Sequence, residues 1–233
     1  MNIGVLKESS LHKYLKFQYS GADGKTEIPV GDYVCDGQTV DGELIEIQTG
    51  SFGPLKEKIK NLSQKNKVRI IYPIIKCKYI EVYDADGKYL RKRKSRLKGS
   101  SWDLFNALLY APELAQTPGV IIELAFIDIV EKRKEDGNGP WRRKFISIGD
   151  KIPYAPINSS AGYESIVLSE LNDYYRFLPF TPKQDFTVSD LAKTAGISVT
   201  LARKCLYVLN KLGLIERIGK KGNSYVYKLG YRV

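Results

Sequence analysis

The stretch Gly31-Asp-Tyr-Val-Cys-Asp36-Gly-Gln-Thr-Val-Asp41-Gly-Glu-Leu-Ile-Glu46-Ile-Gln48-Thr49 predicts a β-hairpin that carries acids among apolar side chains. Successive side chains of a strand point to opposite faces, so Leu44, Glu46 and Gln48 share one face, opposite the isoleucines between them. An acid and an amide on a face that begins with leucine are costly unless something binds them. The stretch therefore indicates a binding site.

The turn of this hairpin decides whether a second acid joins Glu46. A two-residue turn, Asp41-Gly42, pairs Asp36 with Ile47 and leaves it on the opposite face. A three-residue loop, Val40-Asp41-Gly42 with glycine in the left-handed conformation, pairs Asp36 directly with Glu46. We favour the second register, because it places the two acids about 5 Å apart at Cβ. At that distance they can share an oxygen-seeking divalent cation.

An upstream acid has helical spacing relative to two leucines. In a helix predicted near residues 4–18, Glu8, Leu11 and Leu15 follow the i, i+3, i+7 pattern, which puts the glutamate on the inward face. A buried helical acid, followed by an Asp and then by Glu-x-Gln on two strands, resembles the PD-(D/E)XK nuclease superfamily. The resemblance covers residues 1–76, and the wording Glu8-Ser-Ser-Leu-His, Glu46-Ile-Gln-Thr-Gly and Val68-Arg-Ile-Ile-Tyr-Pro-Ile is similar to an uncharacterised bacterial branch.

The resemblance implies an α/β fold with a restriction-endonuclease-like mixed sheet flanked by helices. It also implies catalytic roles for Glu8, Asp36, Glu46 and Gln48. One or two Mg²⁺ ions, or Mn²⁺, are expected on Asp36, Glu46 and the Ile47 carbonyl, with Glu8 assisting through a second metal or a water.

Gln48 departs from the family pattern, which has lysine at this position. Glutamine can orient a water by hydrogen bonding but brings no positive charge. Lys58 is the better candidate for a substituting lysine, because it flanks the Leu55, Ile59 and Leu62 stripe of the next predicted helix. A solvated helix lysine remains the favoured interpretation of Lys58.

The composition limits the function classes. The net charge of +11 suits a polyanionic partner. The chain has one histidine, His12, and three scattered cysteines, which disfavours zinc sites and hydrolase triads and indicates reduced thiols in a cytoplasm. We interpret His12 as structural rather than as a residue at a substrate's edge. No apolar run approaches a membrane span, and the N-terminus lacks the layout of a signal peptide.

The sequence predicts two domains, 1–155 and 156–233, joined by a linker rich in proline, glycine and serine at 149–162. Residues 165–230 resemble a small winged helix-turn-helix domain: a helix capped by Thr187 and Asp190, a second helix from Ser198, and a two-stranded wing. A winged helix can bind DNA, but the same fold also serves dimerisation or domain packing, and both alternatives stay open.

The basic residues suggest several contacts to double-stranded DNA. Four candidates belong to the predicted recognition helix and two to the wing: Ser198, Thr200, Arg203 and Lys204, with Lys220 and Lys221. The basic run 91–98, with Arg91 and Arg93, is either a phosphate clamp or a solvated strand end. Trp141, Arg142 and Arg143 fit a nucleic-acid contact or an exposed hairpin equally well.

Together these patterns predict a magnesium-dependent endodeoxyribonuclease of the restriction or repair type. The alternative is a non-catalytic DNA-binding regulator built on a retired nuclease fold, which Gln48 favours. The sequence leaves open whether the protein forms a homodimer.

Overall fold

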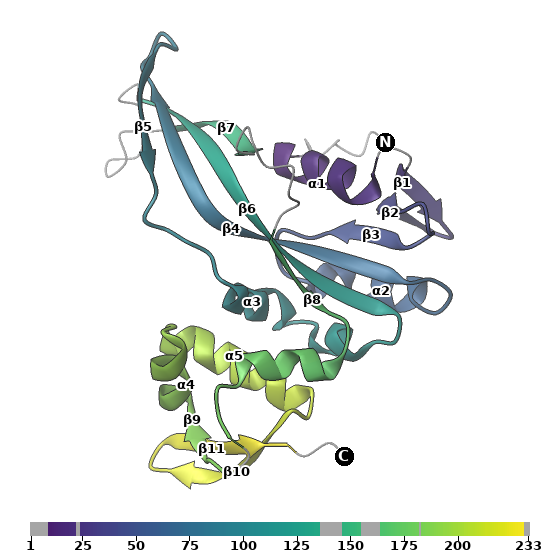
Figure 1. Cartoon of the computed structure of the whole chain (residues 1–233), viewed down its shortest axis with the longest axis vertical. Helices are drawn as coiled ribbons and strands as arrows, with labels where there is room; N and C mark the ends of the chain where they lie inside the picture. The colour runs from purple at the N-terminus through teal and green to yellow at the C-terminus, as the bar shows by residue number, and fades with distance from the viewer. Residues whose placement is uncertain (1–8, 22–23, 136–145, 155–163, 182, 231–233) are drawn as a thin grey trace.

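A computed structural model describes the chain except for residues 1–8, 22–23, 136–145, 155–163, 182 and 231–233. Its larger unit is a curled mixed sheet flanked by helices (Figure 1). The elements of this unit follow one another as α1 (Ser10–Ser20), β1 (Lys25–Val30), β2 (Tyr33–Gln38), β3 (Leu44–Ile47), η1 (Gly53–Leu55), α2 (Lys56–Leu62), β4 (Val68–Tyr83), β5 (Tyr89–Lys94), η2 (Ser101–Asp103), α3 (Leu104–Leu108), η3 (Pro112–Gln116), β6 (Val120–Lys134), β7 (Ile146–Pro153) and β8 (Ser165–Leu168).

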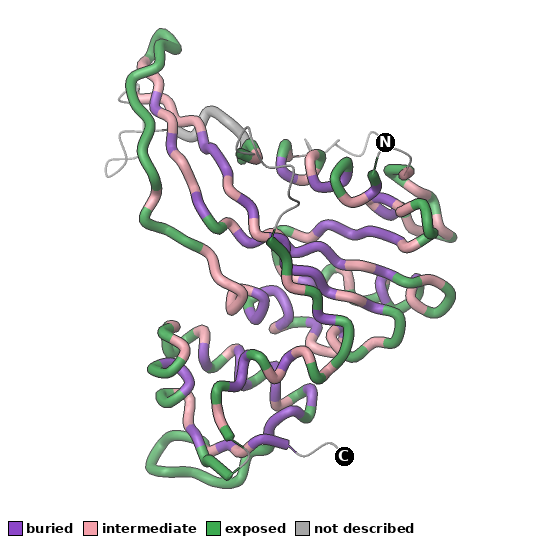
Figure 2. The backbone as a smooth tube through the Cα atoms, viewed as in Figure 1, coloured by how far each residue is buried: buried purple, intermediate pink, exposed green. Residues whose placement is uncertain are grey.

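The sheet has the order β1-β2-β3-β4-β6-β7, with β5 on β4 and β8 on β6. Strand β4 lies parallel to both β3 and β6, whereas the other pairs are antiparallel. Parallel neighbours need crossover connections, and α2 and α3 lie within these crossovers. Figure 2 shows β3 and the adjoining parts of β4 and β6 as the buried centre, and β5 as exposed throughout.

Each face of the sheet has its own apolar cluster. Leu11 and Leu15 of α1 pack with Ile45 and Ile47 on one face. On the other face Leu44 belongs to the cluster that contains the apolar residues of α2 and α3. The alternation expected for residues 44–47 is therefore confirmed, and α1 and α2 cover opposite faces.

The C-terminal unit consists of η4 (Leu171–Phe177), β9 (Phe186–Thr187), α4 (Val188–Ala195), α5 (Val199–Lys211), β10 (Ile215–Lys221) and β11 (Ser224–Leu229). The predicted cap is present: Thr187 and Asp190 bond reciprocally at the start of α4. Strands β10 and β11 form the expected hairpin, and β9 extends it to three strands.

The two units share one apolar cluster, a relation that the sequence did not predict. Phe105 of α3 packs edge-on against Phe177 of η4, with ring centroids 4.9 Å apart. Strand β8, placed in the second domain by the sequence, pairs with β6 of the large sheet. Residues 149–153, expected in a linker, belong to β7. The predicted boundary at 155/156 falls outside the described residues.

Candidate functional site

The hairpin of β2 and β3 has the predicted register. Gly37 pairs with Ile45 and Gln38 with Leu44. The Thr39 N–H donates to the Glu43 carbonyl oxygen at 3.0 Å, which leaves the three-residue loop Val40-Asp41-Gly42. Gly42 has φ 86°, a backbone conformation that strongly favours glycine. In this register the next residue of β2, Asp36, would pair with Glu46 of β3.

Asp36 does not complete that pair, because the two strands separate at this point. The Ile47 N–H donates to Asp36 Oδ2 at 2.8 Å, so a side chain replaces the backbone partner between the strands. On the other side of β2, Glu27 of β1 has φ 57°, a strained backbone for a residue other than glycine. We call this place, with Asp36 and Glu46, the acidic gap.

Two side chains of α1 hold the Asp36 carboxylate. His12 Nε2 lies 3.0 Å from Oδ2, and Lys16 Nζ lies 3.5 Å from Oδ1. Burial raises the pKa of Asp36, but hydrogen bonds from His12 and from the Ile47 N–H outweigh burial and hold the pKa below its usual range. Asp36 is therefore a carboxylate fixed in orientation by three donors. Lys16, which is buried, also pairs with Glu27.

Glu46 is the more deeply buried acid, with 3% of its surface exposed. Its Oε1 forms an ion pair with Lys58 Nζ, and the same ammonium donates to the Val34 carbonyl oxygen at 2.6 Å. Burial raises the pKa of Glu46, Lys58 lowers it, and the charge of Asp36 raises it, with a net upward shift. Burial, followed by the charge of Glu46, raises the pKa of the neighbouring Cys35 thiol to about 11, so Cys35 stays protonated near neutral pH.

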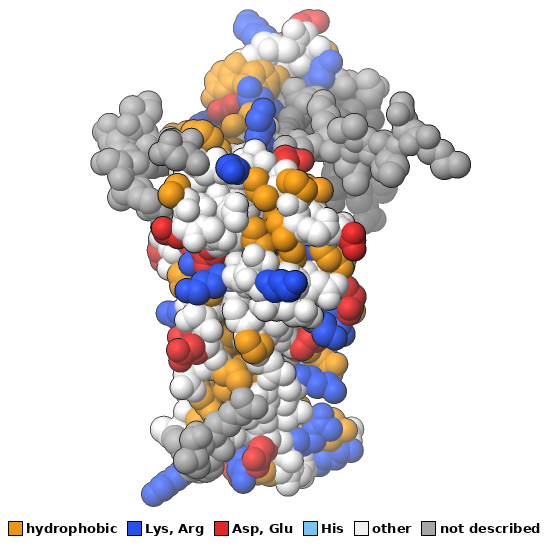
Figure 3. All heavy atoms as spheres, turned by 90° about the vertical axis from the view of Figure 1, so that its right-hand side faces the viewer, with side chains coloured by type: hydrophobic (Ala, Val, Ile, Leu, Met, Phe, Trp, Pro, Cys, Tyr) orange, Lys and Arg blue, Asp and Glu red, His pale blue; other side chains and the backbone are white. Residues whose placement is uncertain are grey.

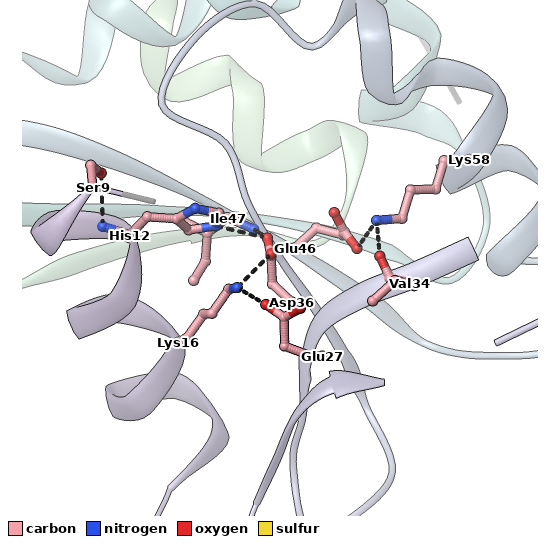
Figure 4. Close-up of polar contacts among 9 residues, drawn as sticks. All are labelled: Ser9, His12, Lys16, Glu27, Val34, Asp36, Glu46, Ile47 and Lys58. Atoms are coloured by element: carbon pink, nitrogen blue, oxygen red, sulfur yellow. Dashed lines mark hydrogen bonds and ion pairs between the residues drawn. The ribbon is translucent and has the colours of Figure 1, made fainter. Parts of the chain in front are cut away.

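The two carboxyl groups are held from different sides, Asp36 by α1 and Glu46 by α2. Figure 4 shows His12 and Lys16 of α1 on one side of Asp36, and Lys58 of α2 beyond Glu46. The prediction that Asp36 and Glu46 share one sheet face is therefore wrong, because Asp36 turns toward α1 where the strands part. The charge of Asp36 nevertheless raises the pKa of Glu46, so the two acids are electrostatic neighbours.

The other residues predicted for this site, Glu8, Gln48 and Lys58, are not brought together into a three-ligand metal site among the described residues. Glu8 lies outside the described residues. Within the part of the chain that the structure describes, no group of three or more His, Cys, Asp or Glu side chains could hold a metal ion. The Gln48 amide nitrogen donates to the Ser51 carbonyl oxygen at 2.5 Å, so that nitrogen serves the following loop. Lys58, expected to be solvated, is instead bound to Glu46.

The predicted recognition helix, α5, exposes a stripe that contains Val199, Thr200, Arg203 and Tyr207. Between this stripe and the β10–β11 hairpin lies a groove whose lining includes Arg203, Tyr207, Arg217 and Tyr225. The Arg217 guanidinium lies 3.6 Å from the centroid of the Tyr225 ring. We call the exposed stripe of α5, together with Arg217 and Tyr225 across the groove, the α5 surface.

The other predicted DNA contacts divide into three groups. Ser198 caps α5, its hydroxyl oxygen accepting from the Leu201 N–H at 3.2 Å. Lys204 Nζ donates to Asn106 Oδ1 of α3 at 2.7 Å, so it faces the large unit and not the groove. Lys220 and Lys221 are exposed on the hairpin, with Lys220 Nζ 4.9 Å from the Tyr225 ring centroid.

The remaining basic candidates were predicted on the 91–98 run and near Trp141. Arg91 and Arg93 are exposed on β5, where Arg91 pairs with Glu135 at 3.0 Å. Arg142 and Arg143 lie outside the described residues. The structure therefore describes only the first of these two basic segments.

Comparison with known proteins adds a family. Residues 9–160 match a family described as a domain of unknown function, DUF8091. The chain belongs to this family. A protein of Treponema pallidum (strain Nichols), described as uncharacterized, is 26% identical over 234 residues, which cover 98% of this chain and 88% of that protein. No solved structure matches the chain significantly. The family match contains every described residue of the acidic gap.

Sequence reasoning missed two groups that bind Asp36. His12 was interpreted as structural, and Lys16 was considered only as its helical neighbour, one that provides no nucleophile. Their i, i+4 spacing puts both on one side of α1, next to the Leu11 and Leu15 stripe, and this was the available signal. Tyr207, Arg217 and Tyr225 of the α5 surface were missed as well. Among the described residues, no helix is both long and apolar enough to cross a membrane.

The position of Gln48 leads to a prediction. Because its amide nitrogen bonds to the Ser51 carbonyl, we expect Gln48→Ala to lower the free energy of unfolding by about 1 kcal/mol. Chemical denaturation would measure this loss. We also expect metal-dependent DNA cleavage, assayed on plasmid, to stay within a few-fold of wild type. A loss of cleavage without a loss of stability would return Gln48 to the chemistry.

Proposed function

We propose that the protein is a metal-dependent endonuclease acting on double-stranded DNA. In this proposal the large unit has a restriction-endonuclease-like fold, and the C-terminal unit is a winged helix that binds the duplex. The observation that carries the proposal is the acidic gap: the paired part of β2 and β3 stops at Gly37 and Ile45, and next to it lie a carboxylate held by three donors and a buried acid whose pKa that carboxylate raises. The elements follow the order α1, β1, β2, β3, α2 and β4, so the two strands that carry the acids, β2 and β3, lie between α1 and α2, as in the superfamily pattern.

The donor atoms at the gap suit magnesium. Mg²⁺ prefers oxygen ligands, and proteins hold it with one or two carboxylates while water completes the shell. Asp36, Glu46 and the Ile47 carbonyl would supply such ligands. A bound cation would also lower the pKa of Glu46 toward its ordinary value, because positive charge favours the ionised form of the carboxyl group. When bound, the metal would polarise a phosphodiester and lower the pKa of a water.

The protein's own residues would prepare the gap for a phosphate. The Ile47 N–H and His12 hold the Asp36 carboxylate in one orientation. Lys58 provides the positive charge that Gln48 lacks, and its ammonium is held beside Glu46 by the Val34 carbonyl. We propose that Lys58 stabilises negative charge on the phosphate during hydrolysis.

Plasmid cleavage tests the proposal. Purified protein is incubated with supercoiled plasmid in Mg²⁺, Mn²⁺ or EDTA, with Asp36→Asn protein prepared in parallel. We expect nicked or linear DNA only in the presence of metal and only with wild-type protein. Methylated and unmethylated plasmids should both be tried, because a restriction enzyme can depend on modification. If wild-type protein binds duplex DNA but cuts none of these plasmids, cleavage is excluded as the function.

A second candidate is DNA binding without cleavage. It is favoured by the partners that each acid already has: the Lys16 ammonium and the His12 ring at Asp36, and the Lys58 ammonium at Glu46. Acids paired in this way can be purely structural. Binding in EDTA together with no cleavage in any metal is the result that this candidate requires.

The α5 surface yields a prediction with a matched control on the next residue. We expect Arg203→Ala to weaken duplex binding by about 1–3 kcal/mol, because Arg203 lines the exposed groove. Lys204→Ala removes the same charge but faces Asn106, so we expect little change in affinity. Fluorescence anisotropy with labelled DNA in EDTA would measure both. Equal losses for the two variants would contradict the proposed orientation of α5.

A further inference from the structure

A second basic region lies on the large unit, where β5 leads toward α3. The β4–β5 hairpin projects from the body of the molecule, and the segment after β5 returns to α3 along the left side of Figure 1. Beside this segment is a depression whose lining includes four cations, Lys76, Lys94, Arg96 and Lys98, and one carboxylate, Asp128. We call it the basic depression.

The backbone fixes the cations at the rim of this depression. The Ser95 N–H donates to the Lys78 carbonyl oxygen at 2.7 Å, and the Gly99 N–H donates to the Ile75 carbonyl oxygen at 2.8 Å. The segment that carries Arg96 and Lys98 is therefore bound to β4 at both ends. A Cβ on Gly99 would lie 3.0 Å from the Ile75 carbonyl oxygen, so this close approach favours glycine.

A β-bulge adds the fourth cation. Ile75 pairs with Ile127 and Cys77 with Asp128, so Lys76 is an extra residue in β4 relative to β6. Bulges redirect side chains, often next to functional sites. Lys76 lines the depression and also pairs with Glu164, while both side chains remain at least half exposed.

An ordinary explanation covers only part of this charge. Edge strands commonly carry lysine and arginine, because these residues oppose pairing with another chain. That explains Arg91, Lys92, Arg93 and Lys94 on β5, which among the described strands pairs with β4 alone. Arg96 and Lys98 lie beyond the end of β5, in a segment that is not itself a strand, so this explanation does not extend to them. By contrast, acids and bases are interspersed over most of the face in Figure 3.

We propose that the basic depression binds phosphate groups of the DNA backbone, as a second contact in addition to the α5 surface. This inference rests on the proposed function and names a further part of its DNA interface. Four cations around one hollow match the repeated charge of a phosphodiester chain, and backbone contacts of this kind position DNA without reading its sequence. The cations belong to β4, to the end of β5 and to the segment that follows β5, all of which are already ordered, so little backbone entropy is lost on binding.

The test compares two variants that lose equal charge. The depression variant carries Lys94→Ala, Arg96→Ala and Lys98→Ala. The control carries Lys25→Ala, Lys60→Ala and Lys65→Ala, three exposed lysines outside the depression. Binding of a labelled duplex is measured by anisotropy in EDTA between about 50 and 200 mM salt. Thermal denaturation checks that both variants fold.

We expect the depression variant to reduce the slope of log affinity against log salt by about 2 to 3, and the affinity by roughly 100-fold, because each lost phosphate contact removes about 0.9 from the slope. The control should change both only slightly. If the two variants match, the inference is overturned, while cleavage by wild-type protein and a loss with Arg203→Ala would leave the proposed function intact. If wild-type protein neither binds nor cuts DNA, both proposals fail.

Discussion

Asp36→Asn is expected to reduce metal-dependent DNA cleavage by about 100-fold or more, the scale seen when a fixed electrostatic group is removed from an active site. Asparagine keeps the size of the side chain and an oxygen that can accept from the Ile47 N–H. It removes the negative charge that would hold the metal. Duplex binding in EDTA should not weaken, because the loss of an anion near phosphate does not reduce attraction.

The matched control is Glu27→Gln. Glu27 is a neighbouring carboxylate that also pairs with Lys16, but its side chain is 66% exposed. We expect this variant to cut plasmid nearly as well as wild type. Initial rates of nicking with saturating Mg²⁺ would measure both variants. Equal rates for Asp36→Asn and wild type would remove Asp36 from the chemistry and leave it as a structural link between α1 and β3.

The structure of the acidic gap shows how far the hairpin could be predicted. The register follows from local chemistry, because a left-handed glycine at Gly42 and the apolar alternation of Leu44 and Ile45 each favour one pairing. The direction of Asp36 depends on distant groups. The Asp36 side chain points toward α1, where His12 and Lys16 contact its carboxylate. On the neighbouring strand β1, Glu27 has a positive φ. No spacing within the hairpin encodes those contacts.

The C-terminal unit shows the same limit. The cap at Thr187 and the hairpin of β10 and β11 could be predicted, since both arise from residues close in sequence. The packing of Phe177 on Phe105 joins segments far apart along the chain. That packing gives Arg203 and Lys204 different surroundings. Adjacent residues of a helix point about 100° apart, and of these two Lys204 is the one that contacts α3. A truncation near residue 156 would uncover this shared apolar surface, so substitutions are the better test.

Lys58→Met is expected to destabilise the protein by about 3 kcal/mol at neutral pH, because it leaves the buried Glu46 carboxylate without its cation. Methionine keeps most of the side-chain volume, so loss of packing is a minor part of the effect. Cleavage should fall as well, since Lys58 is proposed to stabilise charge on the phosphate. Chemical denaturation and the plasmid assay would measure the two effects separately.

The pH dependence of stability shows whether the buried Glu46 carboxylate causes the loss of stability in Lys58→Met. An acid whose folded-state pKa is raised stabilises the protein at low pH, and this stability is lost as the pH rises from the unfolded-state pKa through the folded-state pKa. Glu46 is such an acid, with a pKa raised above its ordinary 4.5. Removing Lys58 raises that pKa further. The deficit of Lys58→Met should therefore grow as the pH rises toward neutral and shrink in acid, where Glu46 is protonated. Asp36, whose pKa is lowered, has the opposite dependence: it stabilises the folded protein near neutral pH, and this contribution is lost as the pH falls through its folded-state pKa.

A double variant separates the structural role of Lys58 from the chemical one. Adding Glu46→Gln to Lys58→Met removes the buried charge, and we expect stability to return to within about 1 kcal/mol of wild type with no dependence on the titration of residue 46. Cleavage should stay absent, because a proposed metal ligand and the proposed cation are both missing. If the stable double variant still cuts DNA, the pair only supports the fold, and the acidic gap is not the catalytic centre.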